Sequence, residues 1–279
     1  MNVARILCST GALVSIPNHR DYRLLEPLSC VLDCDGYEFM IYDSWYGKAA
    51  EIAAFTRDLG MYIPATHCEK YTGEYLGSGR SDLTAEAFRF FEIECDFSQK
   101  LGADSIVLHL WNGRTSDSAF ENNLAAYGRL AAIAADYGEQ LLIENVVCVK
   151  ADPLSRWCEL RERYPNVRFV FDTKMAAFHG QLASLYEDDY SWLWREGHIR
   201  HYHLNDYGGA PHDWSSLKPL PIGEGTIDFE QFFTFVRSTG YDACFTLESV
   251  AYDADGHIYP ERINAQLDRL RELGITNRI

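Results

Sequence analysis

Short apolar runs alternate with amphipathic stretches along the chain, and glycine or proline stands before most of the apolar runs. Runs that are apolar on both faces are typical of strands buried in a parallel sheet. Between them, apolar residues recur every three or four positions, which is the period of an amphipathic helix; examples are 120–134, 229–236 and 263–273. The pattern predicts eight strands, which lie within 3–9, 34–42, 59–67, 101–110, 137–145, 164–172, 196–204 and 239–248.

Strands that alternate with helices pair in parallel through right-handed crossovers. Eight such units in a chain of 279 residues favour a (β/α)8 barrel, an α/β fold of the TIM type. The alternative is a doubly wound sheet, but its glycine-rich phosphate turn should follow the first strand, and the segment GALVSIP is a poor version of one. No linker or low-complexity tract interrupts the pattern, so a single domain is predicted over 1–279.

Composition narrows the class of protein. Lys and Arg total 25 against 41 for Asp and Glu, and the net charge of −16 disfavours nucleic acid as a partner. No run of 18 apolar residues is present, so no membrane span is predicted. The eight cysteines contain no CxxC pair, which argues against a zinc ribbon and, in a chain of this length, predicts reduced thiols and a cytoplasmic location.

Ligand-type side chains stand at the ends of six predicted strands. The carboxyl ends of barrel strands meet at one face, where catalytic residues collect. One such residue could merely cap a helix or meet water, but six in the same position predict a convergent site. In the segment HIRHYHLND, alternation places His201 and His203 on one face of a strand, with His203 nearer its end. The six residues are His67, His109, Glu144, Asp172, His203 and Glu248.

The last four of these six predicted strand ends carry three carboxylates and one imidazole. Carboxylates that face one another repel and need compensation, which a divalent cation supplies. Such a mixed oxygen and nitrogen ligand set suits Mn²⁺, Co²⁺, Zn²⁺ or Mg²⁺ without selecting one of them. The sequence therefore predicts one divalent metal ion.

Five segments together resemble one known family: LLIENV, FVFDTK, HYHLND, PIGEGTIDF and FTLES. They are similar to the sugar phosphate isomerase/epimerase family, the xylose isomerase-like TIM barrels that include ketose 3-epimerases and type-IV apurinic endonucleases. The resemblance implies that Glu144, Asp172, His203 and Glu248 are metal ligands and that the two glutamates exchange protons with substrate. It also implies a small carbohydrate-like substrate and, because barrels of this family often associate, a homo-oligomer.

The expected reaction is isomerisation or epimerisation of a sugar or sugar phosphate, by proton transfer through a metal-stabilised enediolate. A metal-dependent phosphodiesterase of the endonuclease type is the first alternative, and a dehydratase or lyase on the same metal site is another. His67 and His109 are expected to line the substrate pocket; alternatively, they hold a second metal ion together with Glu144.

The sequence departs from the family pattern after the strand-six aspartate. The family usually has D-x-x-H there, but Met175 occupies the histidine position and the next histidine is His179. The D-x-H of the endonucleases is also missing before the glycine motif, where the chain reads SSLKPLPIGEG. Both departures put the standard activities of the family in doubt.

Weaker candidates follow the predicted strands on the same side. Trp45 and Trp111 could stack on a sugar or simply pack. Asp206 could orient a ligand imidazole or the substrate. Further polar residues could contact substrate or its phosphate, and Asp228 is expected to cap the helix that follows the GEG turn. These further residues are Lys174, His212, Lys218 and Arg114.

Overall fold

The computed structural model describes residues 4–113 and 115–274. Its contacts divide the chain into two compact units: a first unit of Met1–Glu38 with Phe171–Ile279, and a second unit of Phe39–Val170. The divisions fall inside two strands, β2 (Gly36–Met40) and β6 (Arg168–Asp172). The single domain over 1–279 stays a prediction.

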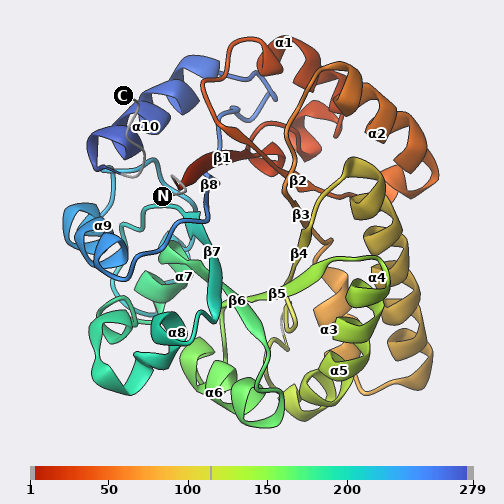
Figure 1. Cartoon of the computed structure of the whole chain (residues 1–279), viewed down its shortest axis with the longest axis vertical. Helices are drawn as coiled ribbons and strands as arrows, with labels where there is room; N and C mark the ends of the chain where they lie inside the picture. The colour runs from red at the N-terminus through yellow and green to blue at the C-terminus, as the bar shows by residue number, and fades with distance from the viewer. Residues whose placement is uncertain (1–3, 114, 275–279) are drawn as a thin grey trace. The chain divides into compact units, whose positions relative to one another are not determined.

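Four strands of the first unit lie side by side in the order β7 (Ile199–Leu204), β8 (Cys244–Leu247), β1 (Arg5–Ser9) and the start of β2. All of these pairs are parallel, as the crossover argument predicts. The register sets His203 opposite Thr246 on β8, and Ser9 opposite Glu38 on β2. Figure 1 shows β7, β8 and β1 adjacent to one another.

Helices of the first unit follow its strands. In α9 (Phe229–Ser238) the apolar stripe of Phe229, Phe232 and Val236 is buried. Phe232 contacts Tyr202 of β7, with ring centroids 5.6 Å apart. Asp228 caps this helix by accepting a hydrogen bond from the backbone N–H of Gln231, which confirms the predicted cap. The helices are α1 (Leu25–Ser29), α7 (Thr173–Phe178), α8 (Trp192–Arg195), α9 (Phe229–Ser238) and α10 (Pro260–Glu272).

The second unit repeats the same arrangement. Strands β3 (Ala65–His67), β4 (Ser105–Leu108), β5 (Gln140–Glu144) and the start of β6 pair in parallel in chain order. Val107, Leu142 and Val170 form a buried cluster across three of these strands. The long helix α4 (Ser81–Leu101) packs against α2 (Ala49–Asp58), α3 (Tyr71–Gly77) and α5 (Phe120–Asp136), and Figure 1 shows the four together. A further helix, α6 (Pro153–Arg163), follows β5.

Each predicted strand segment contains one strand of the structure, although every strand is shorter than its segment. The six candidate ligands lie at or within one residue of a strand end, as the sequence predicts. His67, Glu144 and Asp172 end their strands; His109 and Glu248 come one residue after, and His203 is the penultimate residue of β7.

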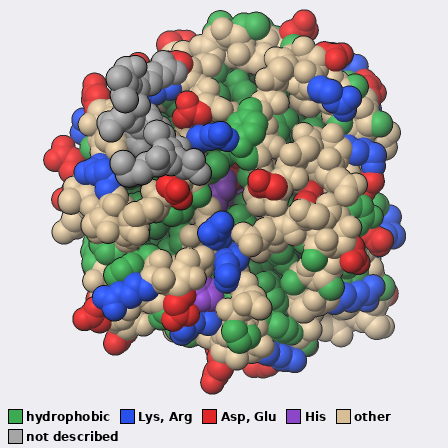
Figure 2. Space-filling view, in the orientation of Figure 1, with side chains coloured by type: hydrophobic (Ala, Val, Ile, Leu, Met, Phe, Trp, Pro, Cys, Tyr) green, Lys and Arg blue, Asp and Glu red, His purple; other side chains and the backbone are tan. Residues whose placement is uncertain are grey.

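Charge is spread over the surface. Figure 2 shows acidic and basic side chains interspersed on the visible face rather than separated into two regions. Over the part of the chain that the structure describes, no helix is both long and apolar enough to cross a membrane. The eight cysteines all lie in that part, and none of them forms a disulfide.

Candidate active site

Three side chains of the first unit bring ligand atoms together: Asp172 from β6, His203 from β7 and Glu248 after β8. One ligand atom from each lies within 4.8 Å of the others. His203 Nδ1 is 3.3 Å from Glu248 Oε1. Asp172 and His203 are fully buried, whereas the side chain of Glu248 is 21% exposed. Glu248 therefore combines contact with this cluster and access to solvent.

Asn205 holds the two carboxylates of this cluster. Its side-chain Nδ2 donates to Glu248 Oε2 at 2.9 Å and to Asp172 Oδ2 at 3.3 Å. The backbone of Asn205 is itself fixed, because its N–H donates to Thr173 Oγ1 and its carbonyl accepts from the same hydroxyl. An amide that donates to both carboxylates reduces their repulsion. The asparagine of the segment HYHLND was not among the residues predicted from the sequence.

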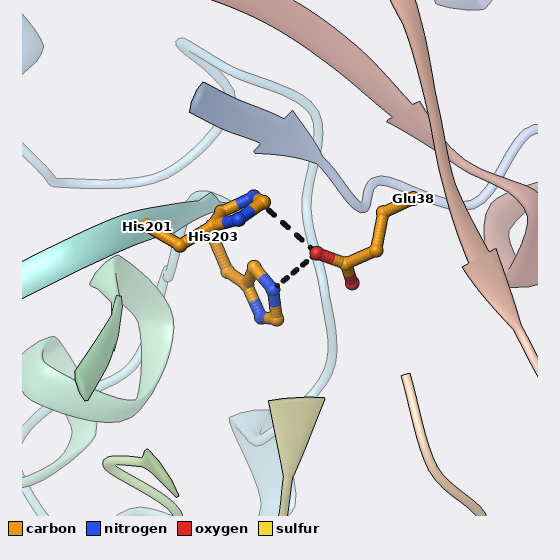
Figure 3. A group of neighbouring side chains, drawn as sticks. All are labelled: Glu38, His201 and His203. Carbon is orange, nitrogen blue, oxygen red and sulfur yellow. Dashed lines mark hydrogen bonds and ion pairs between the residues drawn. The ribbon is translucent and has the colours of Figure 1, made fainter. Parts of the chain in front are cut away.

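Glu38 is a second residue that sequence reasoning missed. It is fully buried on β2, and its Oε2 lies 3.0 Å from His203 Nε2 and 3.3 Å from His201 Nε2. The hydroxyl of Thr246 also donates to Glu38 Oε2, at 3.2 Å. His201 and His203 thus share one face of β7, as alternation predicts, and both rings point to the same carboxylate (Figure 3).

A further cluster is formed by side chains of the second unit. His109 Nε2 is 2.7 Å and His67 Nε2 is 3.2 Å from Glu144 Oε2. His67 Nδ1 lies 2.8 Å from the carbonyl oxygen of Cys68, which can only accept, so this nitrogen carries a proton and a neutral ring presents a lone pair at Nε2. Burial lowers the pKa of His109 below its usual value, against the opposing effect of Glu144. The neutral form of His109, which a metal ligand needs, is therefore favoured.

The donor sets of both clusters fit a divalent cation. The first offers two carboxylates and an imidazole nitrogen, and the second offers one carboxylate and two imidazole nitrogens, each within 4.8 Å. Oxygen and imidazole ligands suit Mn²⁺, Co²⁺ and Zn²⁺. Four of these side chains are also oriented by neighbours, as metal-binding side chains commonly are: Asp172 and Glu248 by Asn205, His203 by Glu38, and His67 by the carbonyl of Cys68.

Asp206 organises the loop that carries the glycine motif. Oδ2 accepts from the backbone N–H groups of Gly223 and Gly225, both at 2.9 Å, and Oδ1 accepts from those of Tyr207 and Ile227. A side chain at Gly225 would meet Asp206 Oδ1 at 2.3 Å, so this position needs glycine. Asp206 was expected to orient an imidazole or the substrate. The carboxylate that contacts His203 Nε2 is that of Glu38 instead.

The two tryptophans are packed within the second unit. Trp45 is 3% exposed and contacts Phe39 and Tyr42. Trp111 is fully buried, and its Nε1 donates to the carbonyl of Val146. Packing inside the protein accounts for the contacts of both rings. Their contact with substrate stays a prediction.

Other weak candidates gather around the end of α7 and the loop after β7. His179 is buried, and its ring lies 5.1 Å from that of His212, whose backbone N–H donates to the carbonyl of Phe178. Met175 and Lys174 are half-buried on α7, and Lys218 is exposed. Their contacts with substrate stay predictions, and Arg114 lies outside the described residues.

Comparison with known proteins places the chain in a family. The family model described as xylose isomerase-like TIM barrel matches residues 31–273. The chain belongs to the xylose isomerase-like TIM barrel family. Membership confirms the predicted fold, eight parallel strands with alternating helices closing a (β/α)8 barrel.

Solved structures of this fold resemble the chain over nearly its whole length. A xylose isomerase domain protein from Planctomyces limnophilus has a TM-score of 0.70 at 16% identity, over 98% of this chain and 97% of that one. A D-allulose 3-epimerase from Methylomonas sp. has a TM-score of 0.69 at 15% identity, over 98% and 99%. A 3-keto-D-glucoside 4-epimerase from E. coli has a TM-score of 0.67 at 15% identity, over 96% and 99%. A search of curated proteins found no match.

Proposed function

We propose that this xylose isomerase-like barrel is a metal-dependent isomerase or epimerase that acts on a small carbohydrate. The observation that carries the proposal is the cluster of Asp172, His203 and Glu248, with its two carboxylates held by one amide. The similar structures named as sugar epimerases support the substrate class.

The proposed metal site adds Glu144 to these three ligands. In a (β/α)8 barrel the carboxyl ends of strands meet at one face, and all four residues lie at or next to such ends. A divalent cation, when bound, supplies positive charge for the negative charge that develops on the substrate. The identity of the ion, and whether the substrate is phosphorylated, follow from the measurements below.

The proposed chemistry is proton transfer through an enediolate. One glutamate carboxylate removes the proton from the carbon next to the carbonyl, and the other returns a proton to complete the reaction. Glu248 suits this role because it is partly exposed, and its Oε2 is oriented by Asn205. His109 Nε2, at 2.7 Å, orients Glu144 in the same way.

A second candidate function is metal-dependent phosphodiester hydrolysis. The cluster of His67, His109 and Glu144 favours it, because these residues could hold a second ion and two-metal sites are common in hydrolases of phosphate esters. The net charge of −16 and the missing D-x-H motif speak against a nucleic acid substrate. A dehydratase or lyase would use the metal site that includes Asp172, His203 and Glu248, and an elimination product would identify it.

A cytoplasmic location and self-association stay predictions.

The deciding experiment combines metal content with carbon exchange. The purified protein is analysed for bound metals, then incubated in deuterium oxide with a panel of ketoses and their phosphates. Bound divalent metal together with deuterium at the carbon next to the carbonyl supports the proposal. Two tightly bound zinc ions, no carbon exchange and cleavage of abasic DNA would refute it.

Replacing the proposed acid/base residue tests the mechanism. Glu248→Gln is expected to abolish deuterium uptake, because the amide cannot exchange protons with substrate. Glu230→Gln is the matched control; Glu230 is exposed at the start of α9, and exchange should stay at the wild-type rate. Exchange that persists in Glu248→Gln would remove Glu248 from this role.

A further inference from the structure

The carboxylate of Glu38 lies on the opposite side of the His203 ring from the proposed metal ligands. His203 Nδ1 faces Glu248 Oε1 at 3.3 Å, while Nε2 faces Glu38 Oε2 at 3.0 Å. A neutral imidazole carries one proton, and the nitrogen that binds a metal must be the one without it. Which nitrogen of His203 can act as a ligand therefore depends on what Nε2 contacts.

The hydrogen bonds around Glu38 assign these roles. The hydroxyl of Thr246 donates its single proton to Glu38 Oε2, so its oxygen can accept the contact from His201 Nε2 at 2.6 Å. His201 Nε2 also lies 3.3 Å from Glu38 Oε2. His203 and Thr246 thus donate to one carboxylate oxygen, and the ring of His201 lies close to the same oxygen; Figure 3 shows the two rings pointing to it.

The surroundings keep this arrangement in place. Glu38, His203 and Thr246 are fully buried, and His201 is 2% exposed. Water therefore does not replace a lost partner readily, and a buried donor without an acceptor is costly. Glu38 lies on β2 and His203 on β7. Two strands, β8 and β1, lie between them in the sheet, and Thr246 belongs to β8.

We propose that Glu38 is a positioning residue: by accepting the proton of His203 Nε2, it fixes the ring and leaves the Nδ1 lone pair for the metal ion. The inference rests on the metal site of the proposed function and adds a residue to it. Carboxylates that orient a ligand histidine typically contribute about 10-fold to 100-fold to metal affinity. In this role Glu38 acts through His203 and is not itself a ligand of the ion.

Metal titration of the metal-free protein tests this proposal without using activity. Calorimetry with Mn²⁺ and Zn²⁺ compares wild type with Glu38→Met, which keeps the volume and removes the acceptor. We expect the dissociation constant to rise about 10-fold to 100-fold with unchanged stoichiometry. In Glu38→Gln the amide oxygen can still accept, so most of the lost affinity should return. Glu139→Met is the matched control, because Glu139 is also a buried glutamate, at 6% exposure, but it lies just before β5 rather than at the carboxyl end of a strand.

A second measurement reads the ring directly. Nitrogen–proton correlation spectra of the metal-free wild type should find a proton on His203 Nε2, and this preference should be lost in Glu38→Met. A wild-type ring protonated on Nδ1 alone would overturn the inference even if Glu38→Met does not fold. So would an unchanged metal affinity in Glu38→Met, or the loss of one whole equivalent of metal, which would make Glu38 a ligand. A wild type that binds no divalent ion would instead refute the proposed function, while the spectra still decide the protonation of His203.

Discussion

Glu94 makes a specific prediction about the pH dependence of stability. This fully buried residue of α4 accepts hydrogen bonds at Oε1 from the hydroxyl of Tyr46, at 3.0 Å, and from the backbone N–H of Glu69, at 2.8 Å. It therefore fixes the segment that follows His67, one of the candidate ligands. Burial raises the pKa of Glu94 to about 7, despite the opposing effect of these hydrogen bonds.

The direction of the pH effect on stability follows from the different pKa of Glu94 in the folded and the unfolded chain. The ordinary pKa of a glutamate, which applies in the unfolded chain, is 4.5, so between that pH and about 7 the folded protein holds a proton that the unfolded chain has lost. The stabilisation that depends on protonated Glu94 is fully present below pH 4.5 and is lost as the pH rises towards about 7. Because one pH unit corresponds to about 1.4 kcal/mol per proton, the loss is about 3 kcal/mol.

The assay is urea unfolding of the metal-free protein at a series of pH values between 4 and 8, for wild type and Glu94→Gln. The variant keeps an oxygen that accepts from Tyr46 and Glu69 but cannot ionise. Its free energy of unfolding relative to wild type should therefore rise by about 3 kcal/mol across the interval. Glu92→Gln, on the exposed face of the same helix, is the control and should follow the wild-type curve. Parallel curves for wild type and Glu94→Gln would refute the reasoning.

Two further predictions concern residues that hold the site together. Asn205→Ala removes the amide between Asp172 and Glu248 and should weaken divalent metal binding about 10-fold or more in calorimetry; unchanged affinity would show that the two carboxylates do not need it. Asp206→Ala removes the acceptor of four backbone N–H groups and should lower the free energy of unfolding by about 2–4 kcal/mol. The same variant should speed hydrogen exchange of the amides of Gly223 and Gly225, and exchange at the wild-type rate would contradict the role of Asp206 in the loop.

The sequence by itself determined the strands, the helices and the positions of the candidate ligands along them. Apolar runs and helical periods report which residues are buried within one element, and a residue at a strand end stays there whatever the element packs against. His67, Glu144 and Asp172 were therefore located correctly at strand ends, and alternation alone put His201 and His203 on one face.

Only the tertiary structure decided which side chains touch. Glu38 lies in a strand whose five residues are all buried, so no alternation marks it, and its contact with His203 joins positions 165 residues apart. Asp206 was expected beside an imidazole or substrate, but its carboxylate binds backbone N–H groups 17 to 21 residues further along. Such partners depend on strand register and on the direction of each side chain, which the order of apolar and polar residues does not specify.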